Sequence, residues 1–316
     1  VDPSMPQKSP YPSVRLLTRR ELNALPPQRW IVTGLLPETG LATIFGPPGS
    51  GKTFLALDLA ASLATGKSKW FGRSLVKRPV VYAALEGGPG IKKRLDAWDI
   101  INNASADELL TILDPINLRD GEAVDDLISS IQEVHPVGPV VFIDTFAQAT
   151  SGADENSSVD MGKAISATQK ISSTLKGLVV LVHHSGKDRS KGLRGHSSML
   201  AAVDTAIRVD EKNQHRQWKA MKVKDAESGS IGIFDLLGCD IGMDVEGQPE
   251  TSCAVRRIDV EPVPSSAEFL PTGKNQQLVY VALKNGLQGD KVINEGVGLK
   301  LAKDALPETR SKHLAN

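Results

Sequence analysis

Apolar runs of strand length alternate with amphipathic segments of helix length through the first two thirds of the chain. Four continuous runs, rich in β-branched residues, predict strands at 41–45, 80–85, 140–143 and 178–182. The segments between or beside them show helical apolar spacing and predict helices at 52–65, 91–101, 122–134 and 161–175. Unbroken apolar strands separated by helices are typical of a parallel sheet that is covered on both faces. We therefore expect an α/β, doubly wound core.

The pattern changes after Asp204, where the apolar runs become shorter and follow one another without helices. These runs predict strands at 205–209, 217–223, 231–237 and 253–258. A turn signal, Glu227-Ser228-Gly229, lies between two of them. We expect these segments to be antiparallel strands that extend the mostly parallel sheet at its C-terminal side.

The two ends of the chain differ in composition from this core. Residues 1–29 contain six prolines, a composition that disfavours helix and sheet and predicts a flexible N-terminal arm. The core domain is expected at 30–260, followed by a Pro-containing linker at 261–273. Residues 274–316 predict a small helical module with helices near 276–284, 296–302 and 308–315, for which a truncated winged helix is one interpretation.

Composition narrows the class of protein. The chain has 316 residues, of which 40% are hydrophobic and 23% charged, and this excludes a disordered, collagenous or coiled-coil protein. No apolar stretch is long enough to predict a membrane span, so no membrane partner is expected. Cys239 and Cys253 lack the spacing of a metal or redox motif and fit a reducing compartment. A cytoplasmic location is the expectation.

The charges are balanced overall but segregated along the chain. Between residues 96 and 160 there are fourteen acidic residues and one basic residue, Arg119. Between residues 187 and 225 there are ten lysines and arginines against five acidic residues. The second segment could offer a local anion-binding face, although two solvated surfaces explain the pattern equally well.

A phosphate-binding loop directly follows the first predicted core strand. The matching residues are Gly46, Pro47, Pro48, Gly49, Ser50, Gly51, Lys52 and Thr53. In this G-x-x-x-x-G-K-[ST] pattern the glycines let backbone N–H groups surround nucleotide phosphates, the lysine reaches the β- and γ-phosphates, and the hydroxyl ligates Mg²⁺. A helix begins at the loop, and its N-terminus adds to the anion site. We expect ATP and Mg²⁺ as cofactors.

Two carboxylates end neighbouring strands and complete the predicted chemistry. Asp144 follows Val140–Ile143 and is the expected second magnesium ligand beside Thr53. The residue after it is Thr145, so a catalytic base must come from elsewhere. Glu86 ends the strand at 80–85 and is the candidate for orienting and deprotonating water, with a loop or capping acid as the alternative.

Two histidines and a basic segment follow the strand at 178–182. Adjacent strand residues face opposite sides, so only one of His183 and His184 faces the nucleotide, and His184 is favoured as a γ-phosphate sensor. Ordinary strand-end histidines are the alternative. The next residues contain Lys187, Arg189 and Lys191, which we expect to contact the phosphates of single-stranded DNA unless the segment is simply a solvated loop.

These residues together resemble the RecA-like ATPases and, within them, the RepA-type hexameric replicative helicases of plasmids and phages. The resemblance covers about residues 30–260. It rests on the phosphate loop, Val81-Tyr82-Ala83-Ala84-Leu85-Glu86, Phe142-Ile143-Asp144-Thr145, Val182-His183-His184-Ser185-Gly186-Lys187, Arg194-Gly195-His196-Ser197-Ser198 and Met221-Lys222-Val223-Lys224.

The resemblance implies a RecA-like core whose ATP site lies between the subunits of a ring, so that a single subunit should hydrolyse ATP slowly. It implies Lys52 and Glu86 as catalytic residues and His184 as sensor, with Arg194 and Lys224 reaching the neighbour's site. Lys222 is the alternative to Lys224. It also implies a homo-hexamer, single-stranded DNA as ligand, and a replication initiator or primase as possible partner.

Three functions remain open at this level. The first is an ATP-dependent DNA helicase that serves replication of a phage, plasmid or integrated element. The second is a recombination ATPase of RecA or RadA type, in which the nucleotide controls assembly on DNA. The third is a nucleotide-gated initiator or loader scaffold without unwinding. Strand displacement on a forked duplex separates the first function from the others.

Overall fold

The computed structural model describes residues 16–153, 157–184, 197–212, 215–258, 274–286, 300–302 and 304–305. The chain divides into two units, Val1–Ile258 and Asp259–Asn316, which are treated separately below. The first unit contains all but the last two residues of the predicted core domain at 30–260, and the predicted linker at 261–273 lies outside the described residues.

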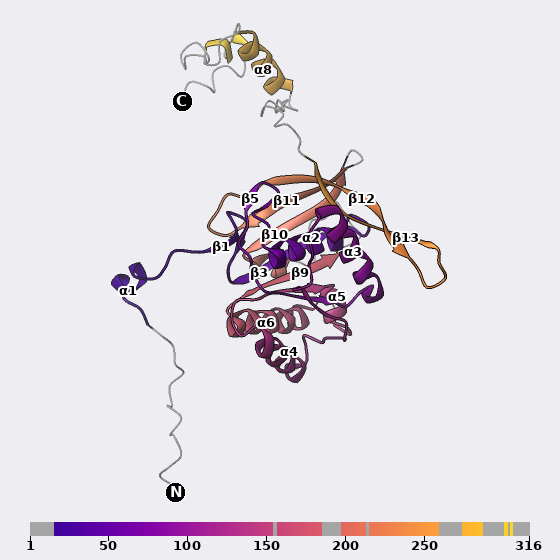
Figure 1. Ribbon diagram of the computed structural model, residues 1–316. Coiled ribbons are helices and arrows are strands. Elements are labelled where there is room, and N and C mark those ends of the chain that lie inside the picture. Colours follow the sequence, from indigo (N-terminus) through magenta and orange to yellow (C-terminus); the bar gives the residue numbers. More distant parts are fainter. Residues whose placement is uncertain are drawn as a thin grey trace. The chain divides into compact units, whose positions relative to one another are not determined.

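A nine-stranded sheet organises the first unit, with the order β13-β12-β11-β10-β3-β9-β8-β6-β7 (Figure 1). Its parallel part comprises β3 (Gly40–Gly46), β6 (Val80–Ala84), β7 (Leu110–Ile112), β8 (Val140–Asp144), β9 (Leu178–His184) and β10 (Thr205–Lys212). Its antiparallel part comprises β11 (His215–Val223), β12 (Ile231–Met243) and β13 (Pro249–Ile258). The α/β fold class, with antiparallel strands added at the C-terminal side, is confirmed.

Helices cover both faces of the parallel strands. One face carries α2 (Lys52–Thr65) and α3 (Ile91–Asn102), and the other carries α4 (Gly121–Val134) and α6 (Ser158–Leu175) (Figure 1). Strand β8 shows why both faces are apolar: Val140 and Phe142 enter the core beneath α2, whereas Val141 and Ile143 enter the core beneath α4 and α6. Because side chains alternate across a strand, a continuous apolar run fills two cores.

Helix boundaries follow local signals in the sequence. Helix α2 ends at Gly66, whose φ of 76° is a left-handed conformation that glycine adopts without steric cost. Helix α4 begins after Asp120, whose side chain accepts hydrogen bonds from the N–H groups of Glu122 and Ala123. Two short helices, α5 (Phe146–Ala149) and α7 (Ser197–Ala202), complete the helical layer on the α4 face.

The N-terminal arm is less featureless than its composition predicts. A short helix, α1 (Arg19–Asn23), forms within the range 1–29, and this part of the prediction is wrong. The reason is local: Thr18 and Glu21 form a capping box in which each side chain accepts a hydrogen bond from the backbone of the other. The capping box follows the four prolines at positions 3–12, so these prolines do not prevent the helix from forming. Residues 1–15 lie outside the described residues.

Short strands that the apolar pattern did not predict surround the core. Strands β1 (Trp30–Val32) and β2 (Leu36–Pro37) pair with each other, as do β4 (Lys69–Trp70) and β5 (Arg73–Ser74). Strand β7 is also unpredicted, because its residues are only partly buried. Segments of two or three residues are too short to show a period of two.

The second unit is described only in part. Helix α8 (Lys274–Gly286) contains the predicted helix at 276–284, and residues 300–302 are helical at the end of the predicted helix at 296–302. The predicted helix at 308–315 lies outside the described residues. In the part of the chain that the structure describes, no helix is both long and apolar enough to cross a bilayer.

A buried carboxylate joins α2 to its neighbours. Asp58, on α2, accepts hydrogen bonds from Trp70 Nε1 at 2.8 Å and from Trp98 Nε1 at 2.9 Å. Burial raises the pKa of Asp58, while both hydrogen bonds and the charge of Lys67 act in the opposite direction. One carboxylate therefore satisfies two buried indole donors, and it fixes α2 against β4 and α3.

We expect Asp58→Ala to destabilise the first unit by about 2–6 kcal/mol, because two buried N–H donors then lose their acceptor at roughly 1–3 kcal/mol each. Urea unfolding followed by tryptophan fluorescence measures the change. Asp58→Ala combined with Trp70→Phe and Trp98→Phe serves as the control, since no donor is then left unsatisfied. If Asp58→Ala unfolds at the same urea concentration as the unmodified chain, the carboxylate does not hold the helix.

Candidate nucleotide site

The phosphate loop lies between β3 and α2, at the carboxyl end of the parallel strands. Gly49 and Gly51 have φ angles of 76° and 92°, and Gly51 is the residue that caps α2. No side chain caps this helix, so its first N–H groups are free of a side-chain acceptor. A loop with positive φ followed by such a helix start presents backbone donors to an anion.

The loop lysine is held inside the loop. Lys52 is buried, and its Nζ donates a hydrogen bond to the carbonyl oxygen of Pro47 at 2.8 Å. Burial lowers the pKa of Lys52, and the negative charges of Asp144 and Glu86 oppose this effect. The ammonium group therefore lies close enough to both carboxylates to interact with them electrostatically.

Asp144 ends β8 on the same face of the sheet as the loop helix. It is 2% exposed, and its Oδ2 accepts a hydrogen bond from the hydroxyl of Tyr82 at 2.6 Å. Burial raises the pKa of Asp144, whereas the hydroxyls of Tyr82 and Thr53 lower it. Its Oδ1 is buried and has no hydrogen-bond partner of good geometry among the described residues. Such an oxygen is available to a cation or a bound water.

Glu86 lies at the open side of the site. Its side chain is 53% exposed, and its Oε2 accepts a hydrogen bond from Thr145 Oγ1 at 3.1 Å. The same oxygen lies 3.7 Å from His184 Nε2. Strand register explains the convergence, because Ala84 is paired with Asp144 and Gly46 with His184. A half-exposed carboxylate beside a buried lysine can accept a proton from water.

The two histidines that end β9 face opposite sides of the sheet. His183 is buried on the α5 side, where its ring packs edge-on against Phe146 at 5.6 Å between centroids. His184 lies on the side of Glu86 and the phosphate loop. Of the pair, His184 is therefore the one that a nucleotide in the loop can contact.

Lys224 and Lys222 lie far from the loop of their own chain. Val223 pairs with Thr205, which in turn pairs with Ala42 near the start of β3, so both lysines lie at the amino end of the parallel strands. Lys224 Nζ is 3.4 Å from Asp204 Oδ1, and Lys222 donates hydrogen bonds to the carbonyl oxygens of the α7 segment. A role for Lys224 in hydrolysis thus requires the site of another subunit.

Four predicted functional residues lie outside the described residues: Lys187, Arg189, Lys191 and Arg194. Two contacts at the site were not predicted. The hydroxyl of Tyr82 donates a hydrogen bond to Asp144, and the hydroxyl of Thr145 donates one to Glu86. Tyr82 lies two residues before the end of β6, on the same face as Glu86. Alternation along the strand could therefore have predicted that Tyr82 points toward the site. The contact of Thr145 depends on strand pairing and has no comparable signal.

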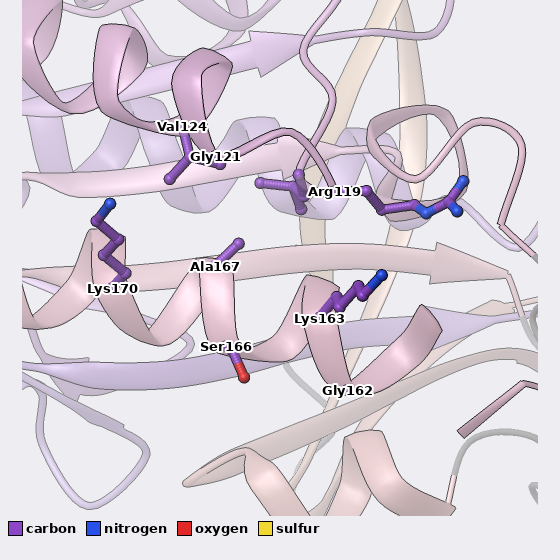
Figure 2. Close-up of a pocket in the computed structure, with 9 residues that line it drawn as sticks. Arg119, Gly121, Val124, Gly162, Lys163, Ser166, Ala167 and Lys170 are labelled. Carbon is purple, nitrogen blue, oxygen red and sulfur yellow. The ribbon is translucent and has the colours of Figure 1, made fainter. Parts of the chain in front are cut away.

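A separate cavity of about 510 Å³ lies between α4 and α6 (Figure 2). Arg119, Lys163 and Lys170 line it, but Arg119 is 3.3 Å from Asp160 and Lys170 is 2.5 Å from Asp125. Most of its positive charge is therefore neutralised by the chain itself. The cavity lies against the opposite face of the sheet from α2, so it is distinct from the phosphate loop.

The fold and this site define a P-loop ATPase. A family model described as an AAA domain matches residues 6–190, which include the phosphate loop, Glu86, Asp144 and His184. The chain belongs to this AAA domain family of P-loop ATPases. Among solved structures, the RadB recombinase matches with 15% sequence identity and a TM-score of 0.44, over 65% of this chain and 90% of that chain.

The residues present fit the nucleotide and Mg²⁺ that the family implies. Magnesium prefers oxygen ligands, and the buried Asp144 Oδ1 and the nearby hydroxyl of Thr53 supply them. Ser50 Oγ in the loop is buried and, within the described ranges, has no hydrogen-bond partner. When bound, the metal would offset the negative charge of the phosphates, and Lys52 and the loop N–H groups would hold those phosphates.

We expect Tyr82→Phe to move the acidic limit of magnesium-dependent nucleotide binding to higher pH. The Tyr82 hydrogen bond lowers the pKa of Asp144, so its loss leaves the carboxyl protonated over a wider pH range and unable to bind a cation. Titrations of a non-hydrolysable ATP analogue with Mg²⁺ between pH 4 and pH 8 measure the shift. Thr145→Val, which contacts Glu86 instead, is the control and should leave this limit in place.

Proposed function

We propose that the chain is the motor subunit of a ring-forming, ATP-dependent DNA helicase of RepA type, acting in replication of a phage, plasmid or integrated element. The observation that carries the proposal is the convergence of Lys52, Asp144, Glu86 and His184 on the phosphate loop from four different elements. This set matches the residues on which the sequence resemblance to RepA-type helicases rests.

The chemistry at the site follows from the exposure of each group. Glu86 is exposed to water and close to the positive charge of Lys52, so it is suited to orient an attacking water and to accept its proton. His184 lies 3.7 Å from Glu86 and can donate a hydrogen bond to a phosphate oxygen at the same place. Thr145 holds Glu86 in position through its hydroxyl.

The location of Lys224 supports a site that is shared between subunits. A cation that lies at the amino end of the strands cannot reach a phosphate bound at their carboxyl end in the same chain. In a ring, the amino end of one subunit can lie against the phosphate loop of the next. Lys224, and Arg194 with it, would then stabilise the charge on the transferred phosphoryl group across the interface.

The proposed DNA contacts follow the nucleotide site directly in sequence. Lys187, Arg189 and Lys191 come three to seven residues after His184, the last residue of β9. A change in the position of His184 upon hydrolysis would therefore be transmitted to the start of this basic segment. Basic side chains that contact phosphates give binding that is independent of sequence and weakened by salt.

Strand displacement on a forked DNA duplex tests the proposed activity. The unmodified chain should separate the strands only with ATP and Mg²⁺, and its mass in solution should rise to that of a ring with an ATP analogue and single-stranded DNA. Glu86→Gln should bind the nucleotide but hydrolyse it at least 10²-fold more slowly, because it lacks the base. Filaments on single strands without unwinding would favour a recombination ATPase, and DNA binding without turnover would favour a loader scaffold.

Mixing two inactive variants tests the shared site. Subunits with Lys52→Ala lack a working phosphate loop, and subunits with Lys224→Ala lack the proposed cation in trans. Mixed rings should recover part of the ATPase activity, because some interfaces then combine an intact loop with an intact Lys224. Lys219→Ala is the matched control, an exposed lysine on the same strand, and should keep its activity when it is assayed alone. No recovery at any mixing ratio argues against a shared site.

A further inference from the structure

The first turn of α2 directly follows the phosphate loop, so side chains around this turn border a nucleotide that binds there. The loop N–H groups and Lys52 hold the phosphates, and the helix begins at the same residue. Phe54, which follows the predicted magnesium ligand Thr53, lies in this turn. Two arginines from different elements, Arg94 and Arg216, reach this turn.

Arg94 approaches from α3. Its guanidinium carbon lies 5.1 Å from the centre of the Phe54 ring, a geometry typical of a cation–π contact. A Cβ atom placed on Gly87 would lie 3.9 Å from Arg94 Nη2, so the guanidinium also borders the turn that follows Glu86. Arg94 thus lies between the loop helix and the strand end that carries the proposed base.

Arg216 approaches from β11 on the other side of the turn. A Cβ atom on Gly51 would lie 2.8 Å from Arg216 Cδ and 3.2 Å from its Nε, so this side chain packs directly against the phosphate loop. The ring of Phe234 lies beside the same point, at 3.4 Å. Arg216 Nε is buried, and it has no hydrogen-bond partner within the described part of the chain.

Neither arginine forms an ion pair within 4 Å of a carboxylate among the described residues, although the charge of Arg94 lowers the pKa of the buried Asp144. Other arginines of the chain do form ion pairs: Arg78 pairs with Glu38, and Arg208 pairs with Asp210. Burial raises the pKa of the Cys253 thiol, and the charges of Arg216 and Arg94 both lower it. A half-buried guanidinium without a counter-ion is costly unless a ligand or an aromatic face covers it.

We propose that Arg94 and Arg216, together with Phe54, form the nucleoside-binding side of the nucleotide site, where the planar guanidinium groups contact the base. This inference rests on the proposed function, because it requires a nucleotide in the phosphate loop. The ligand is then a nucleoside triphosphate, and inorganic tripolyphosphate is the comparison ligand that carries the phosphates without the sugar and base. Guanidinium groups stack on flat π systems, and each such contact contributes to affinity when it is desolvated.

Calorimetric titration of the full chain tests this assignment, with Mg²⁺ and either a non-hydrolysable ATP analogue or tripolyphosphate. Arg94→Ala and Arg216→Ala should each weaken binding of the ATP analogue by roughly tenfold. Binding of tripolyphosphate should change by less than about twofold, since the phosphate loop stays intact. Arg208→Ala, on the adjacent strand and already paired with Asp210, is the matched control and should change neither affinity.

Arg216→Lys tests the same contact with a smaller risk of disrupting the fold than Arg216→Ala. Lysine keeps the charge and an aliphatic stem against Gly51 but lacks the planar group, so it should lose affinity for the ATP analogue and keep that for tripolyphosphate. Equal losses for both ligands, or no loss for the analogue, would overturn the inference while leaving the phosphate loop as proposed. If the unmodified chain binds neither ligand, the proposed function fails and the inference fails with it.

Discussion

The nucleotide site depends on keeping two buried side chains of opposite sign, Lys52 and Asp144, in their charged forms. Burial lowers the pKa of Lys52 and raises that of Asp144, so each group is driven toward its neutral form. The charge of Asp144 opposes this effect for Lys52, and the hydroxyls of Tyr82 and Thr53 and the charge of Arg94 oppose it for Asp144. Charges in such positions persist only when partners surround them. Here the partners are the Pro47 carbonyl, the Tyr82 hydroxyl and the opposite charge. A triphosphate with its metal would supply further partners at the same point.

The sequence predicts a structural element correctly where the residues that determine it lie together in one segment. The bounds of α2 agree with the prediction, because a glycine-rich loop precedes the helix and Gly66 ends it. The core strands are also confirmed, since each is an unbroken apolar run. Alternation along the strand predicts that only one of His183 and His184 faces the nucleotide, and the structure places the favoured His184 beside Glu86. The catalytic roles of these residues remain predictions.

Contacts between distant segments are what the sequence does not reveal. Asp58 is one aspartate in an apolar helix, and its two indole donors come from β4 and α3. Arg216 meets Gly51 only because β11 lies two strands from β3, on the far side of β10, in the sheet order. The hairpin of β12 and β13 is longer than its apolar residues predict, since its outer half is held by main-chain pairing and not by burial.

Strand β11 connects the two ends of the proposed mechanism. Arg216 lies near its first residue, beside the phosphate loop, and Lys224 follows its last residue at the amino end of the sheet. At about 3.3 Å per residue, its nine residues span nearly 30 Å. The strand pairs with β10 on one side and β12 on the other, so it is held along most of its length. If Arg216 contacts the nucleotide of its own subunit and Lys224 that of the next, the strand couples neighbouring sites as a rigid element, without a hinge between them.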